Sequence, residues 1–299
     1  MSPAGYTPFM RRIAGGTPGA DADAAWQPAG AVGQQIPLIG AGEPPAFRVL
    51  NPQGRARLLV VCDHASRRIP AALDNLGLDE LALGRHIASD IGAGDVAELL
   101  SARLDAPAVL AGYSRLVVDC NRGLGDPTSI LAVSDGEFIP GNQGLSDAQK
   151  AERARQFFHP YHDAIARRLE SFARRRIVPA FVAVHSFTPI FKNVRRPWQI
   201  GILWDKDPRI PVPLIEALRA LGIAVGDNEP YSGKAPADHT VDHHAEGGGL
   251  PHVSIEIRQD LIDHPEGIAR WAGILGDVLE KILADEDLYR KWEGTGDGP

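Results

Sequence analysis

Short apolar runs alternate along the chain with longer segments in which apolar residues recur every three or four positions. The short runs have the length and β-branched content of buried strands, and they cover residues 47–50, 57–62, 108–111, 115–120, 181–185, 198–204, 223–225 and 253–257. Helical spacing occurs over residues 92–104, 147–176, 213–221 and 265–285, with Ser146 or Asp147 as the N-cap of the second segment. Strands that alternate with helices predict an α/β fold whose mostly parallel sheet is covered on both faces.

The first part of the chain lacks this periodicity, because Gly, Ala and Pro make up half of its first 50 residues. Such a segment has few side chains whose burial would offset the entropy lost on ordering. We therefore predict a loosely docked N-terminal extension over residues 1–45. A turn at residues 51–54 follows the first strand. No repeat, charge run or linker divides what remains, so residues 46–299 are predicted to form a single domain.

Composition narrows the classes of protein to which the chain can belong. A formal net charge of -7 and a pI near 5.8 argue against a nucleic-acid binder. The longest apolar runs are far shorter than a bilayer span, and no apolar segment follows Arg11 and Arg12 as a signal sequence would require. The two cysteines, Cys62 and Cys120, are too few for a disulfide scaffold. We expect a cytoplasmic protein with no membrane or nucleic-acid partner, while the oligomeric state stays open.

Three of the predicted strands carry a polar side chain where an apolar one would be ordinary. The run LLVVC is followed by Asp63 and His64, the run FVAV is followed by His185, and Glu256 lies inside VSIEI. Ligands of open α/β sheets bind beyond the carboxyl ends of the strands, so two histidines and a glutamate delivered there form a candidate site. A single histidine at a strand end is more often a satisfied polar residue than a ligand. The recurrence at two strand ends is what favours a site.

These residue types point to metal-assisted hydrolysis. Imidazole and carboxylate groups are the usual ligands of catalytic zinc, which activates a bound water, and a further carboxylate serves as general base. Glu256 suits this second task, because a glutamate between apolar strand residues is costly to bury without a compensating charge. Asp90 is the best candidate for the third ligand, although a helix N-cap is its alternative role. His86, four residues earlier, is a weaker candidate.

Arginines form a second feature. In the stretch YSRLVVDCNR, Arg115 and Arg122 flank Asp119. An arginine fork binds carboxylates and can stabilise an oxyanion near a metal. The alternative is a structural Arg–Asp pair, and the spacing favours that alternative for Arg115 while leaving Arg122 open.

The stretch TVDHH offers a rival metal pair. His239 and His243 have the i, i+4 spacing that places two side chains on one face of a helix, and His244 follows. The surrounding Gly, Ala and Pro residues favour a loop instead, and we predict a mobile loop over the site.

Seven short motifs occur in order over about residues 47–285. They are DHAS-x-x-IP (63–70), SDIGA (89–93), YSRLVVDCNR (113–122), PYH (160–162), HSF (185–187), NEPY (228–231) and GLPHVSIEIRQDLI (249–262). No single motif is decisive, but together they resemble the N-formylglutamate amidohydrolase family. The resemblance implies a three-layer fold like that of the zinc carboxypeptidases, with a mixed eight-stranded sheet between helices. It also implies hydrolysis of N-formylated amino acids to formate and the free amino acid.

Carried over position by position, the resemblance implies a set of metal-binding and catalytic residues. His64 and His185 match the two metal-binding histidines, and Glu256 matches the catalytic glutamate of the carboxypeptidases. Asp90 takes the place of the remaining ligand by its position at the head of a helix, not by motif. The ordinary His-x-x-Glu pair is absent, because Arg67 stands where its glutamate would be.

The resemblance also implies residues that bind the substrate. Arg115 matches the arginine that polarises the scissile carbonyl, and Asn121 with Arg122 matches a pair that receives the substrate carboxylate. We therefore predict an amidohydrolase with one Zn²⁺, or another divalent ion, that cleaves small N-acyl amino acids such as N-formylglutamate. A metallo-carboxypeptidase, a deacylase for another acyl group and a non-catalytic binding protein on this fold are the alternatives. The missing His-x-x-Glu motif is the best support for the last of these.

Overall fold

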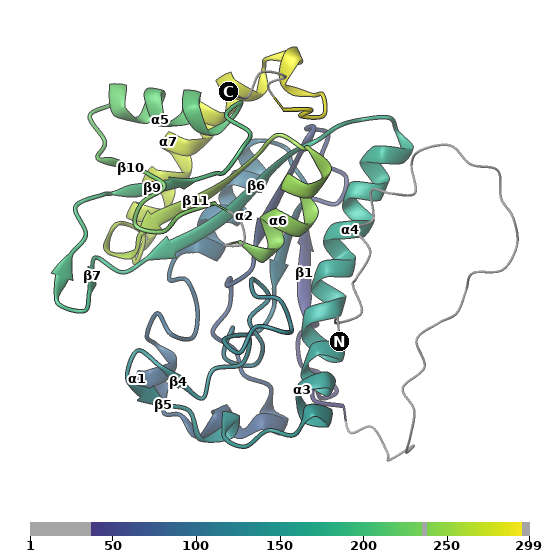
Figure 1. Cartoon of the computed structure of the whole chain (residues 1–299), viewed down its shortest axis with the longest axis vertical. Coiled ribbons are helices and arrows are strands. Elements are labelled where there is room, and N and C mark those ends of the chain that lie inside the picture. The colour runs from purple at the N-terminus through teal and green to yellow at the C-terminus, as the bar shows by residue number, and fades with distance from the viewer. Residues whose placement is uncertain (1–36, 235–237, 295–299) are drawn as a thin grey trace, which may run out of the picture. The chain divides into compact units, whose positions relative to one another are not determined.

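The computed structural model describes residues 37–234 and 238–294, and the chain from Leu38 onward forms one compact unit (Figure 1). Most of the predicted N-terminal extension therefore lies outside the described residues. Of the part that is described, Leu38 and Ile39 donate their backbone N–H groups to the side-chain oxygen of Gln156. No helix among the described residues combines the length and the apolar character that a membrane span needs.

A seven-stranded sheet forms the centre of the described chain. Its strands stand in the order β1 (Phe47–Leu50), β3 (Ala108–Ala111), β2 (Leu58–Cys62), β6 (Ala180–Phe187), β11 (His252–Arg258), β9 (Ile200–Leu203) and β10 (Val225–Asp227). β3, β2, β6 and β11 run parallel, whereas β1 and β9 are antiparallel to their neighbours β3 and β11. β10 is parallel to β9. The sheet is mixed and mostly parallel, as predicted, but it has seven strands among the described residues where the resemblance implied eight.

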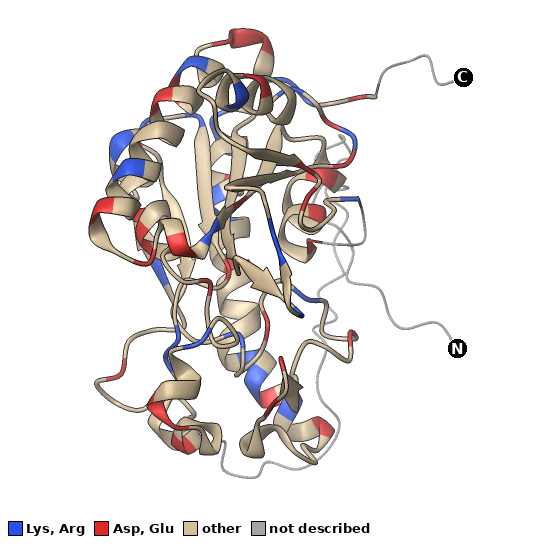
Figure 2. Ribbon diagram, turned by 90° about the vertical axis from the view of Figure 1, so that its left-hand side faces the viewer, with Lys and Arg blue, Asp and Glu red and all other residues tan. Residues whose placement is uncertain are grey.

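Helices cover both faces of this sheet and complete the three predicted layers (Figure 1). One face packs against α2 (Ala93–Arg103), α5 (Pro211–Ala220) and α7 (Pro265–Leu283), and the other packs against α4 (His159–Arg174) and α6 (His239–His244). Charged residues lie mainly on helices and loops in Figure 2, while the central strands are nearly free of them. The layers therefore bury the strands and leave their ends open for polar side chains.

Several shorter elements are not foreseen by the apolar pattern, because they are too short to show a period. They are α1 (Glu80–Leu83), the hairpin of β4 (Val133–Ser134) and β5 (Glu137–Phe138), the hairpin of β7 (Ile190–Phe191) and β8 (Val194–Arg195), and 3₁₀ turns at Ala71–Gly77, Pro140–Asn142, Glu246–Gly248, Gln259–Leu261 and Glu286–Leu288.

The strand predicted over residues 115–120 is wrong. The segment turns instead of pairing with the sheet, and its apolar side chains are buried in a second cluster beside the sheet. Its backbone is satisfied locally, since Ser114 Oγ accepts the N–H of Leu116 and Asp119 accepts the N–H of Asn121. An apolar run of this length shows burial, but burial alone does not distinguish a strand from a buried turn.

The long helix predicted over residues 147–176 is interrupted. α3 (Asp147–Arg153) begins at the predicted cap Ser146, whose hydroxyl accepts the N–H of Gln149. A π-helical segment, η4 (Ala154–Phe158), then separates it from α4. Pro160 in the first turn of α4 accounts for the break, because its ring lacks an N–H and displaces the carbonyl four residues earlier.

Candidate active site

Three of the predicted functional side chains meet at the carboxyl ends of parallel strands. His64 follows β2 after one residue, while His185 lies in β6 and Glu256 lies in β11. These strands are neighbours in the sheet, and Glu256 stands opposite His185 in the register of β6 and β11. All three side chains are buried, so strand pairing holds them at fixed positions.

Asp90 joins the two histidines from the loop before α2. Its Oδ2 atom lies 3.2 Å from Nδ1 of His64 and 2.9 Å from Nδ1 of His185. The alternative role as a helix N-cap is wrong, because Gly92 occupies that position. Gly92 has a φ of 75°, and a Cβ there would lie 2.0 Å from the carbonyl oxygen of Ile262. Only glycine fits at this point, and it lets the loop present Asp90 to the histidines. We call His64, Asp90 and His185 the His–Asp–His cluster.

A second pair of carboxylates faces the far nitrogen of each ring. Nε2 of His64 lies 2.7 Å from Oδ1 of Asp119, and Nε2 of His185 lies 3.3 Å from Oδ2 of Asp63. If Nε2 alone carries the proton and faces its carboxylate, the Nδ1 lone pair of each ring is available to an ion bound beside Asp90. Carboxylates in this position orient ligating histidines in metal sites, so the ring orientations suit an ion bound through Nδ1.

Sequence reasoning did not assign Asp63 and Asp238 to the site. Asp63 adjoins a fully buried apolar run, so its high cost of burial was a usable signal. Asp238 is the N-cap of α6, and its Oδ2 lies 4.0 Å from Nε2 of His185. No local signal marked Asp238, because its place depends on a helix that was interpreted as a loop.

The buried histidines and aspartates can hold a metal ion. Two groups of three offer ligand atoms within 4.8 Å of one another: the His–Asp–His cluster, and Asp63 with His185 and Asp238. Nε2 of His185 and Oδ2 of Asp63 are buried and face each other at 3.3 Å, but neither forms a hydrogen bond among the described residues, so their polar groups are incompletely satisfied. Two imidazoles and a carboxylate are also a donor set of hydrolytic zinc, so these residues fit such an ion.

The pKa of Glu256 is shifted in the opposite direction from the pKa of Asp90. Burial alone would raise the pKa of Asp90, but the adjacent histidines lower it overall. Burial lowers the pKa of His185, whereas Asp63 and Asp90 raise it, and the net pKa lies above the usual value. Burial raises the pKa of Glu256 to about 8, and its Oε2 atom has no hydrogen-bond partner among the described residues. A carboxyl group with a pKa near neutrality is suited to proton transfer.

Arg115, Asn121 and Arg122 line the same cavity. Arg115 is ion-paired with Asp119 at 2.5 Å, so the structural pair that the spacing favoured is present, while the guanidinium still borders the cavity. Oδ1 of Asn121 accepts the backbone N–H of Thr240 at 3.0 Å. This bond leaves the NH₂ group of Asn121 to donate to a molecule in the cavity.

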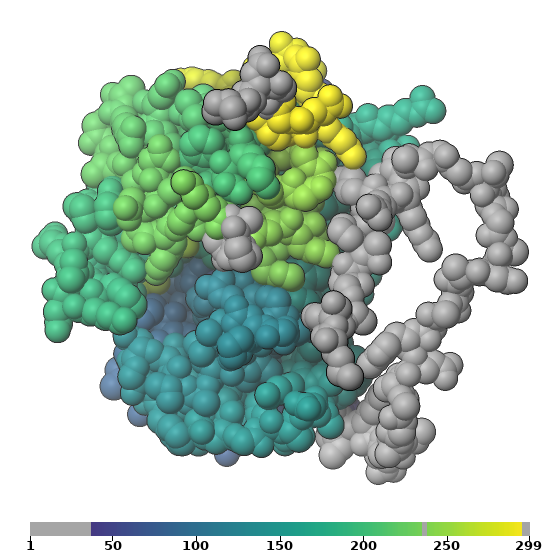
Figure 3. Space-filling view, in the orientation of Figure 1, coloured from purple at the N-terminus to yellow at the C-terminus, as the bar shows by residue number. Residues whose placement is uncertain are grey.

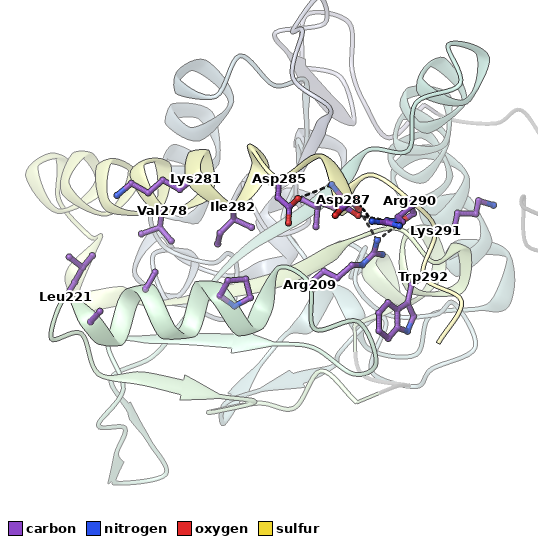
Figure 4. Close-up of a pocket in the computed structure, with 14 residues that line it drawn as sticks. Arg209, Leu221, Val278, Lys281, Ile282, Asp285, Asp287, Arg290, Lys291 and Trp292 are labelled. Carbon is purple, nitrogen blue, oxygen red and sulfur yellow. Dashed lines mark hydrogen bonds and ion pairs between the residues drawn. The ribbon is translucent and has the colours of Figure 1, made fainter. Parts of the chain in front are cut away.

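The cavity measures about 190 Å³, which suits a small molecule better than a peptide. Figure 3 shows the blue and teal segments of the chain meeting the green segments across the middle of this face. A larger groove of about 930 Å³ lies between α5 and the end of α7 and is lined by side chains such as Val278, Ile282, Arg209 and Trp292 (Figure 4). It contains none of the predicted site residues.

None of the other histidines lines the cavity. The prediction of a mobile loop at TVDHH is wrong, since residues 239–244 form α6 and His244 bonds to His162 of α4 at 2.9 Å. His239 and His243 stack on each other, and neither belongs to a group that can hold a metal ion among the described residues. His86 does not line the cavity either.

The raised pKa of Glu256 predicts a pH-dependent effect of the Glu256→Gln substitution in protein stripped of metal by a chelator. The folded carboxyl keeps its proton up to about pH 8, whereas the unfolded one loses it near 4.5. Below pH 4.5 the folded and the unfolded protein both hold this proton, and Glu256 does not lower the free energy of unfolding. As the pH rises from 4.5 to 8, only the unfolded protein releases the proton, so the free energy of unfolding of wild type falls. Over this pH range the free energy of unfolding of Glu256→Gln should rise relative to that of wild type by on the order of a few kcal/mol.

Denaturant unfolding at a series of pH values measures this difference. Glu280→Gln is the matched control, because its side chain is exposed on α7. Parallel stability profiles for wild type and Glu256→Gln would contradict the raised pKa.

Comparisons with known proteins point to one family. The N-formylglutamate amidohydrolase family matches residues 56–263. A gene product of Agrobacterium tumefaciens with a solved structure is 35% identical, with a TM-score of 0.80 over 83% of this chain and 98% of its own. The N-formylglutamate amidohydrolase of Ralstonia eutropha has the same fold at 19% identity, with a TM-score of 0.63 over 80% of this chain and 97% of its own.

None of the curated proteins matches the chain. The family match nevertheless spans every residue of the cluster, Arg115, Arg122 and Glu256. With 35% identity over most of the chain to one solved structure as well, the protein is a hydrolase of amide bonds and belongs to the N-formylglutamate amidohydrolase family.

Proposed function

We propose that this amidohydrolase cleaves N-formyl amino acids to formate and the free amino acid with the help of one divalent metal ion. Zinc is the first candidate for this ion. The observation that carries the proposal is the convergence of the His–Asp–His cluster and Glu256 in one small cavity. The cluster would hold the ion, which when bound supplies Lewis-acid polarisation of water and of the scissile carbonyl.

Glu256 is the proposed general base. It stands opposite His185 in the paired strands and lines the cavity, so a water beside the cluster is within its reach. A nearby cation favours the ionised carboxylate and offsets the effect of burial on the pKa. Glu256 would take a proton from water as the oxygen attacks the formyl carbon. It would return that proton to the amine nitrogen as the C–N bond breaks.

Arg115 and the pair Asn121–Arg122 are the proposed substrate contacts. The guanidinium of Arg115 is held by Asp119 and would stabilise the negative charge that develops on the carbonyl oxygen. The NH₂ group of Asn121 and the guanidinium of Arg122 would bind the carboxylate of the amino acid. These groups supply local positive charge and donors for an anionic substrate in a chain that is acidic overall.

A cavity of about 190 Å³ has the size of a small-molecule site, which favours an N-acyl amino acid as the substrate over a peptide. The proposal also includes a cytoplasmic location, which the two free, buried cysteines support.

Formate release from a panel of N-formyl amino acids, measured with metal-loaded and chelator-treated protein, tests the proposal. We expect formate from the loaded enzyme and a large loss after chelation that added Zn²⁺ reverses. Absence of formate from every member of the panel, with zinc bound, would refute the proposed substrate class.

Arg122→Ala should raise KM for N-formyl amino acids by about ten- to a hundredfold, the loss expected for one charge-assisted hydrogen-bond pair. Steady-state kinetics measure KM, and metal analysis of the same preparation should show little change. Arg174→Ala, at an exposed position on α4, is the matched control. An unchanged KM for Arg122→Ala would sink the proposed carboxylate contact.

A further inference from the structure

One wall of the cavity has no role in the proposed chemistry. Leu203, Tyr231 and Ser232 form it, and they come from the end of β9 and from the loop after β10. The carboxylate contacts adjoin Asp119, which bonds to His64 at the end of β2. β6 and β11 separate β2 from β9 in the sheet, so the wall and Asp119 approach the cavity from different strands.

Tyr231 is held in this wall by a buried arginine. Nη1 of Arg196 donates to the Tyr231 hydroxyl at 3.1 Å, and the guanidinium lies 4.9 Å from the centre of the tyrosine ring. The rings of Phe191 and Phe187 lie 4.8 Å and 5.6 Å from the same guanidinium. Arg196 is 7% exposed, and no carboxylate among the described residues pairs with it. This cation therefore orients an aromatic ring instead of neutralising an acid.

The loop that carries Tyr231 is also fixed to β9. Oδ1 of Asn228 accepts the N–H groups of Trp204 at 3.1 Å and of Gly233 at 2.8 Å. A Cβ on Gly233 would lie 2.3 Å from the nitrogen of Trp204, so the backbone approaches more closely than any other residue would allow. Tyr231 thus occupies a set position although the residue is 45% exposed.

We propose that Tyr231, positioned by Arg196, limits the size of the acyl group that this enzyme hydrolyses. The inference rests on the proposed function, because it places the substrate carboxylate at Asn121 and Arg122. A substrate anchored there, with its amide carbon at the His–Asp–His cluster, directs the acyl substituent across β11 toward β9. The tyrosine ring and Leu203 then leave room for the hydrogen atom of a formyl group but clash with a methyl or larger group.

Kinetics with N-formyl, N-acetyl and N-propionyl derivatives of one amino acid test this inference. Wild type should prefer the formyl over the acetyl substrate by about ten- to two-hundredfold in kcat/KM, since one methylene carries discrimination of this size. Tyr231→Ala should reduce that preference at least about tenfold. Tyr231→Phe keeps the bulk of the ring, so its preference should stay near that of wild type whatever happens to its overall rate.

Two further variants keep the test decisive. Tyr231→Leu serves if the alanine variant does not fold, and Arg196→Met should relax the preference in the same direction by freeing the ring. Phe138→Ala is the control, because it truncates a similarly exposed aromatic ring in the β4–β5 hairpin, and it should leave the preference unchanged.

An undiminished preference in the folded Tyr231→Ala or Tyr231→Leu variant overturns the inference, as does a wild-type enzyme that hydrolyses acetyl and formyl substrates equally well. An undiminished preference in Arg196→Met overturns the part assigned to Arg196. If no N-acyl amino acid is hydrolysed by zinc-loaded wild type, the proposed function itself has failed.

Discussion

Replacing Glu256 by glutamine should lower kcat for formate release by about two to four orders of magnitude, the range that a positioned general base contributes. Glutamine has nearly the same shape but cannot accept and return the proton. Because Glu256 is not a member of the His–Asp–His cluster, metal content should remain near that of wild type. KM should change little, because the carboxylate contacts at Asn121 and Arg122 are untouched.

Steady-state kinetics and metal analysis of the same Glu256→Gln preparation measure these quantities. Glu280→Gln on α7 controls for the loss of a carboxylate elsewhere, and its kcat should equal that of wild type. A Glu256→Gln enzyme that retains a tenth or more of the wild-type kcat would show that another group transfers the proton.

Replacing His185 by asparagine should abolish both metal binding and hydrolysis. His185 contacts Asp90 through Nδ1 and faces Asp63 through Nε2, and it belongs to both groups of ligand atoms. Its loss also leaves two buried carboxylates without their cationic partner. We therefore expect about 3–5 kcal/mol of destabilisation in the metal-free protein, the cost of breaking a buried ion pair.

A buried histidine elsewhere provides the matched control for this variant. His252 lies 2.7 Å from Glu246 in a buried pair outside the cavity, so His252→Asn should destabilise the protein while its zinc content stays near that of wild type. Denaturant unfolding and elemental analysis separate the two variants. Near-stoichiometric zinc in folded His185→Asn protein would remove His185 from the metal site.

The core of the site was predictable because its side chains interrupt buried strands. β2 is an apolar run just before His64, β6 is an apolar run as far as His185, and Glu256 lies between two isoleucines in β11. An acid or an imidazole at such a place is conspicuous. The fold class then predicts that these side chains meet, because parallel strands bring their carboxyl ends to one edge of the sheet. Asp90 was predictable only as one of two alternatives, and the choice depended on Gly92 as the N-cap.

The rest of the site depends on contacts that no local pattern encodes. α6 is six residues long, too short to be stable alone, and its bonds to neighbouring elements hold it in place. The hydroxyl of Thr240 donates to Asp63 at 2.6 Å, and His244 bonds to His162. Asp238 reaches the cavity only because this helix forms. The buried turn at residues 115–120 was missed for the same reason, since its burial is satisfied by side chains distant in sequence.

Because Glu256 is paired with His185 in the register of β6 and β11, catalysis depends on the correct register of these two strands. Ile255 and Ile257 point into the apolar layer on the opposite face from Glu256. A β11 strand that paired one residue out of register would place an isoleucine at the cavity and drive the carboxylate into that layer. Such a misassembled chain could keep its helices and its compactness and still be inert, so activity per molecule reports folding fidelity that bulk spectroscopy does not see.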